Sequence, residues 1–236
     1  MNAALKVISL LLSYPSEEMR QAIPDMKAAI QSAEIGEGHT ALLVRLADDI
    51  EAHDLYDAQE RYVFLFDRTR ALSLHLFEHV HGESRDRGQA MVDLMAMYDA
   101  DGFEIDAREL PDYLPMFLEY LSMKPATQIS ELLGQTVHIL AAIRERLKKR
   151  TSIYSNAFAV LEAMAAATPD ARLLHDLLET PVDDPSDLEA LDRIWEEEVV
   201  AFGGNAGEND CGPDRLQRQI RASNRRPVDI AQDKTV

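Results

Sequence analysis

The stretch LGQTVHILAAIRERLKKR, residues 133–150, decides the fold class of this chain. Its apolar side chains recur every three or four residues, and this spacing places them on one face of an α-helix. They are Leu133, Val137, Leu140, Ile143 and Leu147. Basic side chains gather from Arg144 to Arg150, where positive charge stabilises the C-terminal end of a helix dipole. We therefore predict a helix with one buried face over this stretch.

The same helical period runs through the rest of the chain. Comparable apolar stripes lie within residues 42–50, 91–98, 114–121 and 188–199. The second stripe consists of Met91, Leu94, Met95 and Tyr98, and the third of Leu114, Phe117, Leu118 and Leu121. No segment shows the alternation of β-branched residues that is typical of a strand. We expect an all-α protein, with a single compact domain of about nine or ten helices over residues 1–202.

Local signals indicate where these helices begin and end. Ser16 precedes two glutamates and suits a helix N-cap. The segments 36–38 and 99–102, which contain glycine, and Pro169 are expected to separate helices. From residue 203 onward the chain is punctuated by Gly and Asn and has no sustained apolar face to offset the entropy of ordering. We expect residues 203–236 to form a disordered tail.

The composition excludes several classes of partner. The 236 residues include 24 basic and 42 acidic side chains, for a net charge of −18. Such a charge argues against nucleic-acid binding and against docking on an anionic membrane, and it favours a basic peptide or protein partner. The apolar run near the N-terminus is interrupted by Lys6 and is too short to cross a bilayer, so we expect no direct membrane insertion. The single cysteine, Cys211, cannot form an intrachain disulfide.

Ionisable side chains crowd the stretch FEHVHGESRDRGQAMVDL, residues 77–94. They are Glu78, His79, His81, Glu83, Arg85, Asp86 and Arg87. The run 72–80 has a helical pattern, Gly82 suits the left-handed residue that ends a helix, and Ser84 suits the cap of the next helix. Gly88 would permit close helix packing or the close approach of a bound chain. The crowding predicts a metal site, an acid–base site or a charged recognition surface.

One motif in this region belongs to a class of enzymes. His75, Glu78 and His79 match the H-x-x-E-H pattern of inverted zinc peptidases. On a helix the two histidines would share a face as zinc ligands, and Glu78 would serve as the general base. No third ligand is evident downstream, and so short a motif often arises by chance. A zinc metallopeptidase is therefore the alternative function.

A second cluster of acids and aromatic rings occupies ELPDYLPMFLEYL, residues 109–121. We predict that Asp112 caps a helix whose first turn contains Pro115, where the missing N–H of proline costs nothing. The helix would bury its apolar stripe and keep the carboxylates of Glu109, Asp112 and Glu119 on its polar side. Two similar acidic and aromatic clusters favour recognition over catalysis.

These two clusters together resemble the NarJ-type molybdenum-cofactor assembly chaperones, also called nitrate reductase delta subunits. The resemblance extends upstream through RYVFLFDRTRALSLHLFEHVHGE, residues 61–83, and downstream to IWEEEVVAF, residues 194–202. It covers most of residues 5–202. It implies an all-α fold, no catalysis and a cytoplasmic location.

The resemblance also implies a client. That client is the catalytic (alpha) subunit of respiratory nitrate reductase, bound while it is in an alpha–beta complex. The chaperone binds the N-terminal leader peptide of the catalytic subunit. The chaperone would bind no cofactor stably and would assist insertion of the molybdenum cofactor into its client before membrane assembly. The leader of this family resembles a twin-arginine signal, which is amphipathic and basic.

A basic amphipathic leader predicts a groove with an apolar floor and an acidic rim. The expected floor consists of Tyr62, Phe66, Leu74, Phe77 and Phe117. The expected rim consists of Asp67, Glu78, Glu83, Asp86, Glu109, Asp112 and Glu119. Tyr113 would present an amphipathic ring beside them, and Arg68, Arg85 and Arg87 would pair with some of the acids. His79 and His81 would either pack or make release sensitive to pH.

Overall fold

A computed structural model of the chain describes residues 2–80, 85–105 and 109–179. All of them belong to one compact unit, Met1–Asp187. The stripe at 188–199, the boundary at 202 and the tail 203–236 lie outside the described residues and remain predictions. The predicted helix junction at Gly82 and Ser84 also lies outside them.

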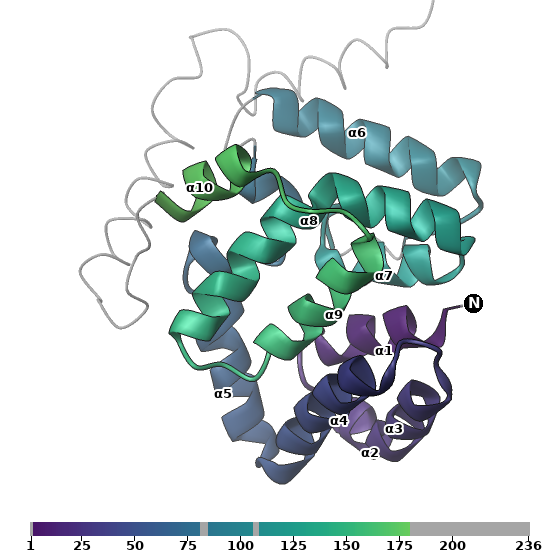
Figure 1. Cartoon of the computed structure of the whole chain (residues 1–236), viewed down its shortest axis with the longest axis vertical. Helices are drawn as coiled ribbons and strands as arrows, with labels where there is room; N and C mark the ends of the chain where they lie inside the picture. The colour runs from purple at the N-terminus through teal and green to yellow at the C-terminus, as the bar shows by residue number, and fades with distance from the viewer. Residues whose placement is uncertain (1, 81–84, 106–108, 180–236) are drawn as a thin grey trace, which may run out of the picture. The chain divides into compact units, whose positions relative to one another are not determined.

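Within these described ranges the chain forms ten α-helices and two short 3₁₀ helices, and no strand (Figure 1). The α-helices are α1 (Ala3–Leu11), α2 (Glu17–Gln21), α3 (Ile23–Ser32), α4 (Glu37–Ala52), α5 (Leu55–Phe66), α6 (Arg85–Ala100), α7 (Leu114–Ser122), α8 (Ala126–Lys149), α9 (Ser155–Ala165) and α10 (Ala171–Glu179). The 3₁₀ helices are η1 (Arg70–Leu72) and η2 (Leu76–His79). The all-α prediction is confirmed.

Caps account for several of the helix boundaries. The side chain of Ser16 accepts a hydrogen bond from the backbone N–H of Met19 at 3.2 Å, which confirms the predicted N-cap of α2. Asn2 caps α1 in the same way through the N–H of Leu5. Gly36 precedes α4 with φ of 83°, and Gly102 follows α6 with φ of 70°. These are left-handed conformations that glycine adopts without strain, so both predicted breaks are confirmed.

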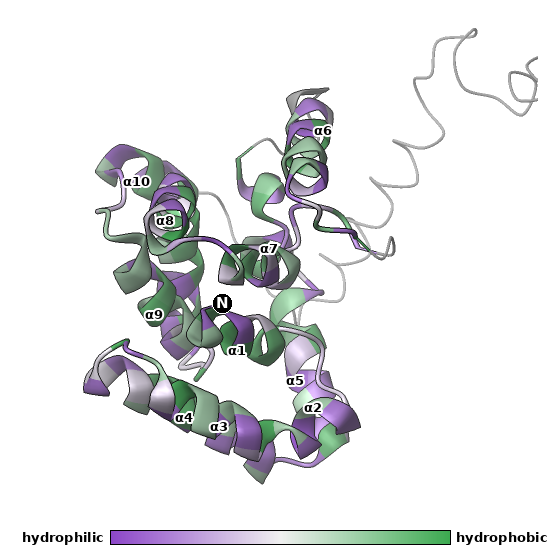
Figure 2. Ribbon diagram, turned by 90° about the vertical axis from the view of Figure 1, so that its right-hand side faces the viewer, coloured by the Kyte–Doolittle hydropathy of each residue, from purple (hydrophilic) through white to green (hydrophobic). Residues whose placement is uncertain are grey.

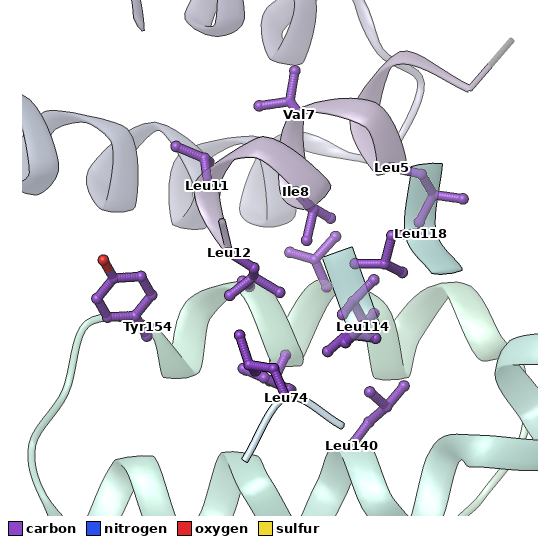
Figure 3. Packing of buried hydrophobic residues seen from close by; sticks show 14 of the residues in the cluster. Leu5, Val7, Ile8, Leu11, Leu12, Leu74, Leu114, Leu118, Leu140 and Tyr154 are labelled. Atoms are coloured by element: carbon purple, nitrogen blue, oxygen red, sulfur yellow. The ribbon is translucent and has the colours of Figure 1, made fainter. Parts of the chain in front are cut away.

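The core forms where α8 packs on α9 and α1 packs on α7. The predicted stripe of α8 is buried: Leu133, Leu140, Ile143 and Leu147 have no exposed surface. Figure 3 shows leucines of α1 and α7 meeting Leu74 and Leu140. Burying one leucine stabilises the fold by about 1.5–3 kcal/mol, so these contacts hold α7 and the Leu74 segment in fixed positions. Helices α3 and α4 pack on each other on the other side of α1 (Figure 2).

The structure corrects the prediction of one helix over residues 72–80. Two 3₁₀ turns flank an extended segment, in which the C=O of Leu74 accepts a hydrogen bond from the N–H of Leu114 at 2.8 Å. The N–H of Leu76 donates to the C=O of Asp112 at 3.1 Å, and His75 forms an antiparallel bridge with Tyr113. Backbone pairing between segments distant in sequence replaces the helical bonds that the apolar spacing predicted.

A smaller correction concerns the inward face of α6. Met95 was expected in the buried stripe, but it is 46% exposed. The inward residues are Leu94, Met97 and Tyr98, and Tyr98 has no exposed surface. Met97, two residues further along the chain, is partly buried against the core in the place that the spacing had assigned to Met95.

Candidate functional site

Asp112 is the buried centre of the candidate site. It has no exposed surface, and its Oδ2 accepts a hydrogen bond from the backbone N–H of Phe77 at 2.9 Å. Its Oδ1 lies 3.2 Å from Nδ1 of His75. These bonds and the backbone pairing above join residues 74–77 to residues 112–114, and we call this arrangement the clasp.

The burial of Asp112 corrects two predictions. The N-cap residue of α7 is Tyr113, which makes no side-chain capping bond, so Asp112 does not cap this helix. Asp112 also cannot stand on an exposed acidic rim, because the clasp encloses its carboxylate completely. A buried carboxylate needs hydrogen bonds to offset its lost hydration, and the N–H of Phe77 and the ring of His75 supply them.

The two histidines of the H-x-x-E-H pattern have separate structural partners. The hydrogen bond with Asp112 raises the pKa of His75. Nε2 of His79 lies 2.8 Å from the backbone C=O of Ser73, and burial lowers the pKa of this ring. Glu78 pairs with Arg87 at 3.2 Å. Among the residues that the structure describes, no three potential metal ligands come together, so the geometry does not support a zinc site.

Most of the predicted groove floor lies in the core. Tyr62, Phe66, Leu74 and Phe117 are each no more than 4% exposed, so a peptide would not reach them in this conformation. Tyr62 instead donates a hydrogen bond to the C=O of Leu12 at 3.0 Å, and its hydroxyl lies 3.0 Å from that of Tyr113. Only Phe77, of the five predicted floor residues, is partly exposed. Of these buried residues, Leu74 belongs to the clasp and Tyr62 contacts it through Tyr113.

Three carboxylates surround the solvent side of the clasp. Asp67 and Glu109 are exposed, and Glu78 is partly exposed. All three act electrostatically on the clasp. Beside the hydrogen bond from Asp112, Glu78 and Glu109 also raise the pKa of His75. Burial is the main cause of the raised pKa of Tyr113, and Glu109 and Asp67 raise it further. Partial burial raises the pKa of Asp67, while His75 acts in the opposite direction. We call Asp67, Glu78 and Glu109 the acidic surface.

The other predicted rim residues are distributed differently. Glu119 pairs with Lys6 of α1. His81 and Glu83 lie outside the described residues. Arg85 and Asp86 begin α6, and their side chains are not described. The predicted pairing of Arg87 with an acid is confirmed by its contact with Glu78.

Sequence reasoning missed two contributors to the site. His75 entered only as a metal ligand, although it is the side-chain partner of Asp112. Tyr98 entered only as an apolar residue, although its hydroxyl donates a hydrogen bond to the C=O of Pro111 at 2.9 Å and holds the loop before Asp112. Periodicity reports which face of a helix is buried and carries no signal for either hydrogen bond.

Comparison with known proteins shows the family of this chain. The family model for the nitrate reductase delta subunit matches residues 16–160. The chain belongs to the nitrate reductase delta subunit family. Within it, the nitrate reductase molybdenum cofactor assembly chaperone NarJ of Escherichia coli (strain K12) is 40% identical over 217 residues, which cover 92% of each chain. NarJ of Bacillus subtilis (strain 168) is 32% identical over 66% of this chain and 84% of its own length.

The fold of this delta subunit family member also matches a solved structure. A redox enzyme maturation protein from Archaeoglobus fulgidus aligns with a TM-score of 0.51 at 20% identity, over 70% of this chain and 94% of its own. This match concerns the fold alone. Of the helices that the structure describes, none combines the length and apolarity needed to span a bilayer.

Proposed function

We propose that this chain is an assembly chaperone that binds the N-terminal leader of the nitrate reductase catalytic subunit. It keeps that subunit competent for insertion of the molybdenum cofactor before the enzyme assembles on the membrane. Membership in the delta subunit family, with an assembly chaperone 40% identical over nearly the whole chain, supports the role. The chaperone acts in the cytoplasm, on the catalytic subunit alone or in its alpha–beta complex, and it is not an enzyme.

The acidic surface is the observation that carries the choice of ligand. Asp67 and Glu109 are exposed carboxylates beside the partly exposed rings of His75 and Tyr113. Carboxylates form paired, charge-assisted hydrogen bonds with guanidinium groups, and aromatic faces accept the apolar side of an amphipathic helix. A basic amphipathic leader meets both requirements. The clasp fixes Tyr113 and His75 in advance, so little ordering is needed on binding.

The side chains of the site that could bind a cofactor already have partners within the protein. The two histidines and Asp112 are already engaged within the clasp or with the backbone. We propose that the chaperone binds no cofactor stably and that the molybdenum cofactor goes to the client.

Charge reversal on the acidic surface tests the proposal. Asp67→Lys combined with Glu109→Lys is expected to weaken binding of a synthetic leader about tenfold or more in calorimetry, because two attractive contacts become repulsive. Glu131→Lys, at an exposed acidic position of α8, is the matched control and should leave the affinity unchanged. Asp112 is unsuitable for such a test because its reversal would place a lysine in the core.

The outcomes separate the possibilities clearly. If the unaltered chain fails to bind the leader, the proposed function is wrong. If it binds and the double variant binds equally well, the leader uses another surface. Binding of an unrelated basic peptide with the same affinity would indicate a general helical adaptor instead.

A further inference from the structure

Helix α6 has two opposite apolar faces. The inward face, with Leu94, Met97 and Tyr98, packs against the core. On the other side Val92 is 58% exposed and Met95 is 46% exposed. In Figures 1 and 2 this helix lies at the margin of the fold, with a long side that no other described helix covers.

The outward apolar residues form a continuous line. Gly88, Val92 and Met95 are spaced by four and three residues, which places them one above another on a single helix face. We call them the outward stripe. A side chain built at Gly88 would meet nothing within 4 Å among the residues that the structure describes, so none of these residues packs closely on the glycine. Ala96 is also exposed on this side, beside the stripe. Small residues of this kind let a second helix approach closely.

The charged side chains described near the outward stripe are acidic, and one of them, Asp99, continues the line of the stripe four residues after Met95. Among the described side chains of α6, the exposed charges are Asp93 and Asp99. The basic residue Arg87 is partly buried and pairs with Glu78. A solvated helix face normally carries many charges of both signs, whereas this one has two acids beside an apolar line. Its complement is a helix with an apolar face and basic flanks.

We propose that the outward stripe docks an amphipathic, basic helix of the client leader. The inference rests on the proposed function and adds a second contact surface to it. The ion pair of Arg87 with Glu78 places the N-terminal end of α6, where the stripe begins, beside the acidic surface. A leader bound to the acidic surface can therefore reach α6. From Gly88 to Met95 the stripe extends about 10 Å, or two helical turns, which a short leader helix can match.

A neutral double variant tests the docking. Val92→Thr with Met95→Gln replaces both exposed apolar side chains by polar ones of similar size and adds no charge. We expect binding of the synthetic leader to weaken about tenfold in calorimetry, because the apolar contact is lost while the charges stay. Tyr56→Gln removes another exposed apolar side chain, 79% exposed on α5, and should leave the affinity unchanged. The thermal midpoint of both variants should equal that of the unaltered chain, since the replaced groups are solvated.

A photo-crosslinking measurement gives an independent readout. Benzoylphenylalanine placed at position 95 should crosslink to the leader, whereas the same group at position 56 should not. Unchanged affinity of the double variant, or no crosslink from position 95, would overturn the docking on α6 while leader binding by the unaltered chain still supports the proposed function. Failure of the unaltered chain to bind the leader would overturn both.

Discussion

At the residue scale, Asp112 determines the local structure of the site. Its carboxylate binds the backbone of Phe77 and the ring of His75, so one buried group orders two segments that are 37 residues apart. Such a group stabilises the fold only while its partners remain, because an unpaired buried carboxylate costs several kcal/mol. Asp67 and Glu109, by contrast, are exposed, and they are the carboxylates that the proposed leader binding uses.

The pKa of His75 leads to a prediction about pH. Because Asp112 raises this pKa in the folded state, the pair contributes its full stability below the unfolded value of about 6.5. That contribution is lost as the pH rises through the raised folded pKa. We expect the loss in unfolding free energy caused by His75→Gln to be larger near pH 6 than near pH 9. Urea unfolding at both pH values measures it.

His79 opposes this trend, which makes the comparison of variants necessary. Burial lowers its pKa, so the folded state loses stability as the pH falls through the unfolded value. His79 is present in both the unaltered chain and the His75→Gln variant. Its contribution to the pH dependence of stability therefore cancels when the two are compared. A loss that is equal at the two pH values would contradict a charged His75–Asp112 pair.

At the scale of single elements, a buried arginine of α8 binds the backbone of α10. Arg146 is 6% exposed, and its guanidinium donates hydrogen bonds to the C=O of Ala71 in η1 and to that of Leu177 in α10. Helix α10 has no buried residue of its own. A helix of nine residues is marginal in water without tertiary contacts, so this bond contributes substantially to its position.

Replacing Arg146 by methionine should therefore release α10 selectively. Methionine fills most of the space of the arginine stem but cannot donate to either carbonyl. We expect amide exchange in α10 to accelerate about tenfold or more, measured by hydrogen–deuterium exchange. Helix α9, which is packed against α8 through apolar side chains, serves as the internal control and should keep its protection. Equal acceleration in α9 would indicate general destabilisation instead.

The elements also show where sequence reasoning succeeds. Helices α7 and α8 follow from their apolar stripes because one buried face decides their structure. The segment 72–80 has an equally helical pattern, yet its backbone pairs with residues 112–114. No local property of a sequence reveals a hydrogen bond to a segment so far along the chain. For the same reason Asp112 was assigned to the exposed acidic rim, whereas its carboxylate is buried.

At the scale of the whole molecule, a net charge of −18 affects how the chaperone meets its ligand. A field of one sign accelerates the encounter with a basic peptide, and salt screens it over about 8–10 Å at physiological ionic strength. We expect the association rate of the leader to fall at least tenfold between about 20 mM and 500 mM NaCl, measured by stopped-flow fluorescence. The dissociation rate should change less, because apolar contacts are not screened. An association rate that does not change with salt would contradict the proposal that the acidic charge of the chain attracts the leader.

The clasp also determines which part of the chain can change in length. Residues 74–77 and 112–114 are paired side by side, so the segment between them is a long connection whose two ends are held together. Lengthening such a connection costs little free energy, since each doubling of the length of a flexible loop adds only about 0.6 kcal/mol to the entropic cost of closing it. Among the described side chains of α6, which lies in this excursion, only Tyr98 is fully buried. The clasp thus holds together the two ends of the segment that contains α6, so this segment can change in length without separating residues 74–77 from residues 112–114, provided that Tyr98 keeps its buried place.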